Sequence, residues 1–260
     1  MARGGGGAAA MSARFPGFDG TPLALHRVGR GRPVVLLHGL FSSAEMNWIK
    51  WGHATAVAER GYKVLMPDLR AHGHSSAPHD AASYPSDVLV QDLAALVAYL
   101  NLADYDLGGF SLGARTALHA VARGAVSPRR LVVGGMGLAG AIHATARAGH
   151  FRRVIDDFDA IPKGDPAWFA VQFLKSQKVD RVAARHLLGS FIDLPPAALA
   201  HVIMPTLVVC GSEDADNGSA AELAAALPDA DYVAVPGTHM GSVTRPELGR
   251  AIAEWLGPPP

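Results

Sequence analysis

The sequence predicts an α/β fold, with a mostly parallel central sheet of about eight strands flanked by helices and a helical cap insertion. Short runs rich in Val and Leu alternate with longer Ala-rich amphipathic segments, as strands and crossover helices do in a parallel sheet. The chain has 260 residues, of which 49% are hydrophobic, so it can bury a substantial core. Residues 138–200 interrupt the alternation, which indicates an insertion.

The expected strands and helices follow from local patterns. Asp19 and Gly20 lie between two strand-like runs, 14–18 and 21–28, and predict an opening β-hairpin. The run 33–37 is apolar throughout, as in a strand covered on both faces. Further strands are expected over 62–66, 105–109, 130–133, 206–210 and 231–235. Helices are expected over 54–60, 86–100, 112–123, 220–227 and 246–255.

These elements divide the chain into a tail, a core and an insertion. Residues 1–14 are rich in Gly and Ala and are expected to form a disordered tail. Residues 15–137 and 201–257 form the predicted core. Residues 138–200 show no strand pattern but hold six of the 18 aromatic residues, so we interpret them as a helical cap whose apolar side faces the sheet over a pocket.

Charge and cysteine content exclude several classes of protein. The 23 Lys and Arg balance the 23 Asp and Glu, so neither nucleic acid nor a membrane surface is an expected partner. A small-molecule substrate without strong charge is expected instead. One cysteine cannot form an internal disulfide or a thiolate metal site. No stretch is long and apolar enough to span a bilayer or to act as a signal peptide, so a cytoplasmic location is expected. The oligomeric state leaves no signal in the sequence.

A serine lies in the segment 109–113, Gly-Phe-Ser-Leu-Gly, between an expected strand and an expected helix. A tight strand-to-helix turn strains the backbone at the serine, and flanking glycines let the turn close without a Cβ clash. The turn directs the Ser111 hydroxyl out of the C-terminal edge of the sheet, beside the positive end of the helix. Ser111 is the candidate nucleophile; the alternative is a glycine-rich turn with an N-capping serine.

A serine hydroxyl needs a base to take its proton, and His239 is the best placed of the 12 histidines. It is expected in a loop after the last strand, at the edge where such a sheet exposes its working loops. His38 also follows a strand, but the residues after it favour another role for that loop, and His119 lies eight positions beyond Ser111 and points elsewhere. Three histidines of one loop are expected to be solvated or to stabilise turns: His72, His74 and His79. No histidine pair has the spacing of a zinc-binding helix, so no metal site is expected.

The base in turn needs a carboxylate that fixes its tautomer and stabilises its charged form. Asp214 lies in the loop after the strand 206–210, and the 25 positions from there to His239 accommodate one helix and one strand. Both loops would then meet at one edge of the sheet. Asp216 and Glu213, in the same loop, are the alternatives.

Acyl transfer also needs two donors for the oxyanion that forms during the reaction. The loop His38-Gly39-Leu40 ends a central strand, and Gly39 lets its backbone approach a ligand closely. The backbone N–H groups of Leu40 and Leu112 are therefore the expected oxyanion hole. An ordinary strand exit would look the same, so the dipeptide His-Gly alone carries little weight.

Together these residues resemble the α/β-hydrolase superfamily, in particular its short serine-hydrolase branch of esterases, lactonases, carbon–carbon bond hydrolases and cofactor-free haloperoxidases. The segments that carry the resemblance are 19–20, 33–39, 67–75, 109–113, 211–214 and 237–239. The resemblance implies that Ser111 is the nucleophile, Asp214 the acid and His239 the base. It also implies that Asp68 and Gly73 shape a loop.

Two departures from the family pattern matter. A serine at the nucleophile position, where some branches have an aspartate, argues against the epoxide hydrolases and haloalkane dehalogenases. The loop after the penultimate strand lacks the proline that often follows the acid, which keeps Asp216 in contention.

We therefore expect a serine hydrolase that cleaves a carboxylic ester or lactone of a small, largely apolar substrate through an acyl-enzyme, without a cofactor. One alternative is a carbon–carbon bond hydrolase of a ring-cleavage product, in which Arg115, Arg152 or Arg153 would bind a substrate carboxylate. Another is a small-ligand binding protein that keeps the hydrolase fold but has little turnover.

Overall fold

The computed structural model describes residues 11–259 and contains one eight-stranded sheet in the order β1-β2-β4-β3-β5-β6-β7-β8. The strands are β1 (Met11–Pro16), β2 (Pro22–Gly29), β3 (Arg32–Leu37), β4 (Tyr62–Pro67), β5 (Asp106–Phe110), β6 (Leu131–Gly134), β7 (Thr206–Gly211) and β8 (Ala230–Val235). The pairs β1–β2 and β2–β4 are antiparallel, and all the others are parallel. The predicted fold class is therefore confirmed, and each expected strand is present with its ends shifted by a few residues.

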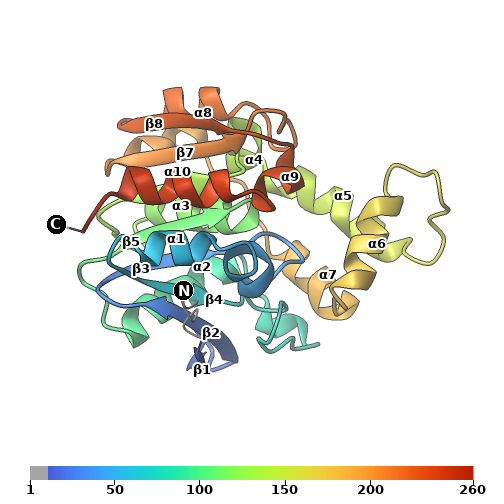
Figure 1. Ribbon diagram of the computed structural model, residues 1–260. Coiled ribbons are helices and arrows are strands. Elements are labelled where there is room, and N and C mark those ends of the chain that lie inside the picture. The colour runs from blue at the N-terminus through green and yellow to red at the C-terminus, as the bar shows by residue number, and fades with distance from the viewer. Residues whose placement is uncertain (1–10, 260) are drawn as a thin grey trace, which may run out of the picture.

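Helices cover both faces of the sheet (Figure 1). They are α1 (His53–Ala58), α2 (Val88–Tyr99), α3 (Leu112–Ala122), α4 (Leu138–Ile142), α5 (Ala144–Asp156), α6 (Trp168–Ser176), α7 (Arg181–Gly189), α8 (Ala220–Ala226), α9 (His239–Val243) and α10 (Pro246–Leu256). Short turns of other helix types are Glu45–Ile49, Ala81–Ser83 and Pro196–His201.

Alternate residues of each central strand enter separate apolar clusters, as the two-residue period of a strand requires. In β3, Val34 and Leu36 pack with α1 and α10, whereas Val35 and Leu37 pack with α2, α3 and α8. The apolar run that predicted this strand is thus buried on both sides. The result is a rigid three-layer core whose parallel strands all point their C-terminal ends at one edge.

The N-terminal prediction needs a correction. Residues 1–10 lie outside the described part of the chain, but residues 11–14, which we expected in a disordered tail, belong to β1. This strand pairs with β2 along its whole length, from Met11 opposite Arg27 to Pro16 opposite Pro22. Its order comes from backbone hydrogen bonds to a neighbouring strand and from burial of Phe15, and the composition of the tail reveals neither.

Helices α4 to α7 lie between β6 and β7 in the chain, and Figure 1 shows α5, α6 and α7 extending to one side of the sheet. They form an apolar cluster that includes Val154, Phe158 and Leu174 and that also takes in Phe41 from the loop after β3. The aromatic side chains do not all face inward, since Phe169 is 77% exposed. The contact with Phe41 joins this helical segment to the core beside the C-terminal edge of the sheet.

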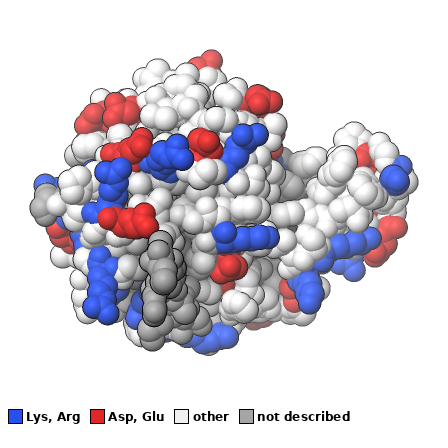
Figure 2. Space-filling model, in the orientation of Figure 1, with Lys and Arg blue, Asp and Glu red and all other residues white. Residues whose placement is uncertain are grey.

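The surface is mixed in charge. Figure 2 shows Lys and Arg interspersed with Asp and Glu on one face of the molecule. Over residues 11–259, no helix combines the length and apolarity needed to cross a bilayer.

Candidate active site

Ser111 occupies the turn between β5 and α3 with φ of 52° and ψ of −114°, a conformation that L-residues rarely adopt. The two flanking glycines make this turn possible. A Cβ at Gly109 would overlap the backbone of Gly113, and a Cβ at Gly113 would overlap the carbonyl of Leu37. The predicted tight turn is therefore present, and it holds the Ser111 side chain at the edge of the sheet.

The Ser111 hydroxyl is hydrogen-bonded to His239, which is hydrogen-bonded to Asp214. The distance from Ser111 Oγ to His239 Nε2 is 3.0 Å, and that from His239 Nδ1 to Asp214 Oδ2 is 2.8 Å. Because the carboxylate accepts the Nδ1 proton, Nε2 is left as the acceptor for the serine hydroxyl. The three predicted residues thus form one continuous series, and both Ser111 and His239 are buried.

His239 was expected in a loop, but it is the first residue of the short helix α9. The Thr238 hydroxyl caps this helix by accepting the Gly241 N–H at 3.2 Å. The cap satisfies an N–H that would otherwise lack an acceptor at the helix start. A helical turn with a capped start holds the imidazole more firmly than an open loop would.

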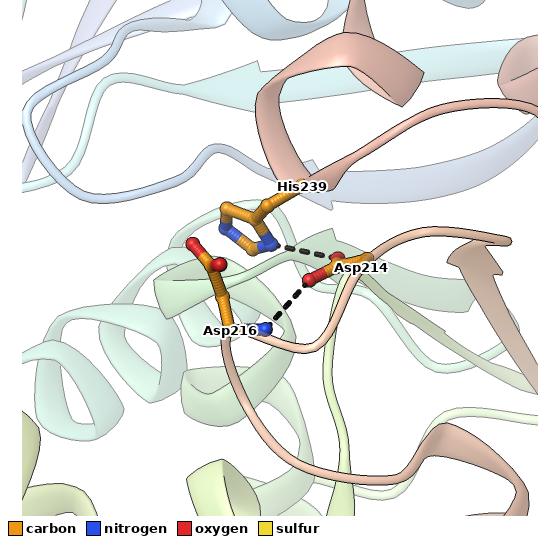
Figure 3. Close-up of side chains that lie close together, drawn as sticks. All are labelled: Asp214, Asp216 and His239. Carbon is orange, nitrogen blue, oxygen red and sulfur yellow. Dashed lines mark hydrogen bonds and ion pairs between the residues drawn. The ribbon is translucent and has the colours of Figure 1, made fainter.

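Asp214, and not Asp216 or Glu213, contacts the imidazole Nδ1. The Asp214 side chain is buried, whereas Asp216 and Glu213 are exposed. Burial by itself would raise the pKa of Asp214, but the hydrogen bond and the charge of His239 outweigh it and lower that pKa below its usual range. Figure 3 shows the Asp216 carboxylate on the other side of the imidazole from Asp214.

Possible metal donors also meet here. One donor atom from each of Asp214, Asp216 and His239 lies within 4.8 Å of the others. The bond between His239 Nδ1 and Asp214 already uses two of these groups, so this cluster is explained as part of the serine–histidine–aspartate series.

The loop after β3 is held on both sides of Leu40. The Gly39 N–H donates to Asn47 Oδ1 at 2.9 Å, and the Phe41 N–H donates to His72 Nε2 at 2.9 Å. Among the described residues, the N–H groups of Leu40 and Leu112 have no protein acceptor, and both leucines lie beside Ser111 in the wall of a cavity. Two residues whose N–H groups have no acceptor in the described part of the chain therefore line the same cavity as Ser111, and their role as an oxyanion hole stays a prediction.

Two further histidines, His38 and His72, hold this loop in place through hydrogen bonds to the backbone. His38 accepts the Leu69 N–H at Nε2 (2.9 Å), and His72 donates from Nδ1 to the Arg70 carbonyl (2.9 Å). Burial lowers the pKa of both, for His72 to about 3, so both rings are neutral. A solvated role for His72 was therefore the wrong alternative, and the turn-stabilising role is the one that the structure shows.

Asp68 organises the same region through three contacts. Its carboxylate accepts the N–H groups of Ala44 and His74, each at 2.8 Å, and contacts His26 Nε2 at 3.1 Å. A Cβ at Gly73 would overlap this carboxylate. These contacts match the loop-shaping role that the resemblance implies for Asp68 and Gly73.

The cavity beside Ser111 is lined by both the core and the segment 138–200. Ala148 and Phe151 of α5, with Phe191, form the wall opposite the core. Arg115 also lines this cavity, whereas Arg152 and Arg153 do not. Neither Phe191 nor Arg115 belongs to a recognisable sequence motif, and only the packing of the two side chains shows that they line the cavity.

Comparisons with known proteins agree with the fold. A profile of the family described as "alpha/beta hydrolase fold" matches residues 32–155. Over 105 aligned residues the chain is 35% identical to an N-formylmaleamate deformylase of Pseudomonas putida. The alignment covers 40% of this chain and 37% of that protein. The aligned part therefore spans just over a third of that relative's length.

Solved structures match over nearly the whole chain. A hydrolase from Pseudomonas aeruginosa has a TM-score of 0.75 at 20% identity, covering 96% of this chain and all of that one. An esterase from Thermogutta terrifontis has a TM-score of 0.70 at 23% identity, covering 95% and 98%. At these identities the likeness shows the fold. Together with the family profile over residues 32–155, it shows that the chain has the α/β-hydrolase fold.

Proposed function

We propose that this protein is a serine hydrolase that cleaves a carboxylic ester or lactone through an acyl-enzyme. The observation that carries the proposal is that one imidazole, His239, contacts both the Ser111 hydroxyl at 3.0 Å and the Asp214 carboxylate at 2.8 Å. A nucleophile, a base and an orienting acid in hydrogen-bond reach are what nucleophilic catalysis by serine needs.

In the first half-reaction, His239 Nε2 takes the hydroxyl proton as Ser111 Oγ bonds to the carbonyl carbon. The carbonyl electrons move onto oxygen, and the Leu40 and Leu112 N–H groups donate to that oxyanion. When the tetrahedral intermediate collapses, the C–O bond to the alcohol breaks, and His239 gives its proton to the leaving oxygen. Each preorganised donor typically contributes about 3 kcal/mol to such a step.

In the second half-reaction, water attacks the acyl-enzyme on the same carbon. His239 takes a proton from the water, the oxyanion forms again beside Leu40 and Leu112, and the proton returns to Ser111 Oγ as the acid leaves. The ionised Asp214 stabilises the charged imidazole in both halves. All groups in this cycle are amino-acid side chains or backbone amides, so the proposal uses no cofactor.

The lining of the cavity supports a substrate that is mainly apolar. Most of the residues that line the space beside Ser111 are apolar, as is usual for a small-molecule pocket.

The test is covalent labelling of the purified full chain with a fluorophosphonate, followed by hydrolysis of p-nitrophenyl esters of increasing acyl length. We expect labelling at Ser111 and turnover that is greatest for short chains. A protein that binds ligands without turnover would bind an ester and resist the label. A carbon–carbon bond hydrolase would take the label but would turn over a ring-cleavage product much faster than any ester. Absence of label from the folded protein would overturn the proposal.

A further inference from the structure

Arg115 is a buried cation in the wall of the cavity that holds Ser111. It follows Ser111 by four positions at the start of α3, so the two residues lie on the same face of the helix, one turn apart. Only 3% of the Arg115 surface is exposed. A guanidinium is seldom buried unless its charge and its N–H groups have partners.

The hydrogen-bond partners of Arg115 satisfy only some of its N–H groups. Nη2 donates to Asp87 Oδ1 at 3.0 Å and lies 3.4 Å from the Ile192 carbonyl. Nε and Nη1, which carry three of the five N–H groups, are fully buried and have no acceptor among the described residues. A buried donor without an acceptor is costly, so these groups point to an acceptor that the protein itself does not provide.

The charges of the cavity lining favour an anion as that acceptor. Outside the lining, Asp87 is shared, since its Oδ2 also lies 3.7 Å from Arg123 Nη1 and 3.5 Å from His119 Nδ1, and Asp193 is a second carboxylate near Arg115. The described lining of the cavity includes a second cation, Arg147, and no Asp or Glu. Arg147 is itself occupied, because it donates to the Asp216 carbonyl at 2.7 Å and lies 3.6 Å from the Asp216 carboxylate. Arg115 is thus the buried cation of this lining, and its Nε and Nη1 are left without an acceptor among the described residues.

Phe191 covers the guanidinium, with the Arg115 Cζ 4.4 Å from the ring centroid. The ring supports the cation through its π face and keeps bulk water away from it. Nε and Nη1 have no exposed surface in this structure, so contact with an anion in the cavity requires the packed side chains to shift. Exclusion of water strengthens the hydrogen bonds that then form.

We propose that Arg115 binds a carboxylate group of the substrate whose ester or lactone carbonyl is attacked by Ser111. This inference rests on the proposed function and narrows its substrate class to apolar esters or lactones that carry one carboxylate. Hydrogen bonds from a guanidinium to a carboxylate are about twice as strong as those between neutral groups, so the charge would set specificity. Arg115 is in this view a substrate-binding residue, and the reaction steps on Ser111 are unchanged.

The experiment compares matched anionic and neutral esters. The anionic substrates are mono-4-nitrophenyl succinate, glutarate and adipate, and each is paired with the ester of the corresponding monoamide, which has the same shape and no charge. The readout is the ratio of kcat/KM between the two members of a pair, which does not depend on how much of a preparation is folded. We expect the wild-type ratio to exceed about ten for at least one chain length.

The Arg115→Gln variant is expected to lower that ratio by about tenfold to a hundredfold, mainly through KM. Arg152→Gln is the matched control, because it removes an equal charge from α5 outside the cavity lining, and its ratio should equal that of the wild type. If Arg115→Gln fails to fold because Asp87 is left unpaired, Asp87→Asn with Arg115→Gln removes both charges. An unchanged ratio in the folded variant, or a drop in Arg147→Gln alone, would overturn the assignment.

A binding measurement separates failure of this inference from failure of the proposed function. Calorimetry with glutarate and Ser111→Ala needs no turnover, and we expect binding that disappears when Arg115→Gln is added. Turnover of both esters with a wild-type ratio near one would reject the carboxylate site and leave the hydrolase intact. No turnover of any ester, with no fluorophosphonate label, would reject the hydrolase, and the calorimetry would still decide on the carboxylate site.

Discussion

His239 Nδ1 and Asp214 Oδ2 lie 2.8 Å apart although 25 positions separate them in the chain. The connection between them consists of α8 and β8, and β8 returns parallel to β7. One crossover therefore brings both loops to the same edge of the sheet, where Ser111 follows β5. The relationship is a consequence of parallel topology.

Asp214→Asn is expected to reduce kcat for a p-nitrophenyl ester by about 10³-fold to 10⁴-fold, because an amide no longer holds the imidazole in the tautomer that leaves Nε2 free. Asp216→Asn is the matched control, since this exposed side chain does not contact Nδ1, and its kcat should stay within a few-fold of the wild type. Steady-state kinetics of both variants decide the point. A larger loss in Asp216→Asn would mean that Asp216 is the acid.

Ser111→Gly is expected to be more stable than Ser111→Ala. Both variants remove the hydroxyl, but only glycine relieves the strain at φ of 52°, which is worth about 1–3 kcal/mol. The greater backbone freedom of glycine in the unfolded chain offsets about 0.5–1 kcal/mol of this gain. Urea denaturation should therefore give Ser111→Gly a free energy of unfolding about 1 kcal/mol higher. Equal stabilities would show that the turn is unstrained.

The free energy of unfolding is expected to fall as the pH drops below about 6.5, the usual pKa of histidine. Burial lowers the pKa of His38, His53 and His72, the last to about 3, so the unfolded chain takes up protons that the folded chain excludes. Each such group removes up to about 1.4 kcal/mol per pH unit between its two pKa values. The sign for His26 is opposite, because its hydrogen bond to Asp68 raises its pKa and favours its charged form in the folded state.

Urea denaturation at pH 7.5 and pH 5 measures this slope. His72→Gln is the informative variant, because glutamine does not take up a proton when the chain unfolds at low pH. The loss of stability between the two pH values should therefore be smaller by about 1–2 kcal/mol. An identical pH slope in His72→Gln and the wild type would contradict the neutral, buried state of His72.

Cys210 is expected to resist alkylation in the folded protein. Burial, together with the nearby Asp214 charge, raises the pKa of the thiol to about 12, and Sγ donates to Asp214 Oδ2 at 3.3 Å. Because the thiolate is the reactive form, iodoacetamide at pH 8 should modify the native chain on the order of 10³-fold more slowly than the chain in urea. Mass spectrometry gives both rates, and equal rates would show that the thiol is accessible and ionised.

Local patterns in the sequence predicted the fold class and selected Ser111 and His239, but they left Asp216 and Glu213 open beside Asp214 until the structure showed which carboxylate contacts Nδ1. A run such as 33–37 reports burial on both faces, and glycines at 109 and 113 report a turn that closes against backbone. The spacing between two strand ends limits which loops can meet. The apolar run and the paired glycines are short-range signals, so neighbouring residues in the sequence reveal them.

Contacts between distant segments were not predictable in this way. Residues 11–14 are ordered by an edge pairing with β2, and His239 sits on a capped helical turn that its neighbours do not announce. The sequence did not distinguish Arg115 from Arg152 and Arg153 as a candidate for binding a carboxylate. In the structure Arg115 contacts Asp87 and Phe191, which come from separate parts of the chain. Whether a charge is buried, and with which partners, depends on how whole elements pack, because desolvation and hydrogen-bond satisfaction are properties of the assembled interior and not of a local run of residues.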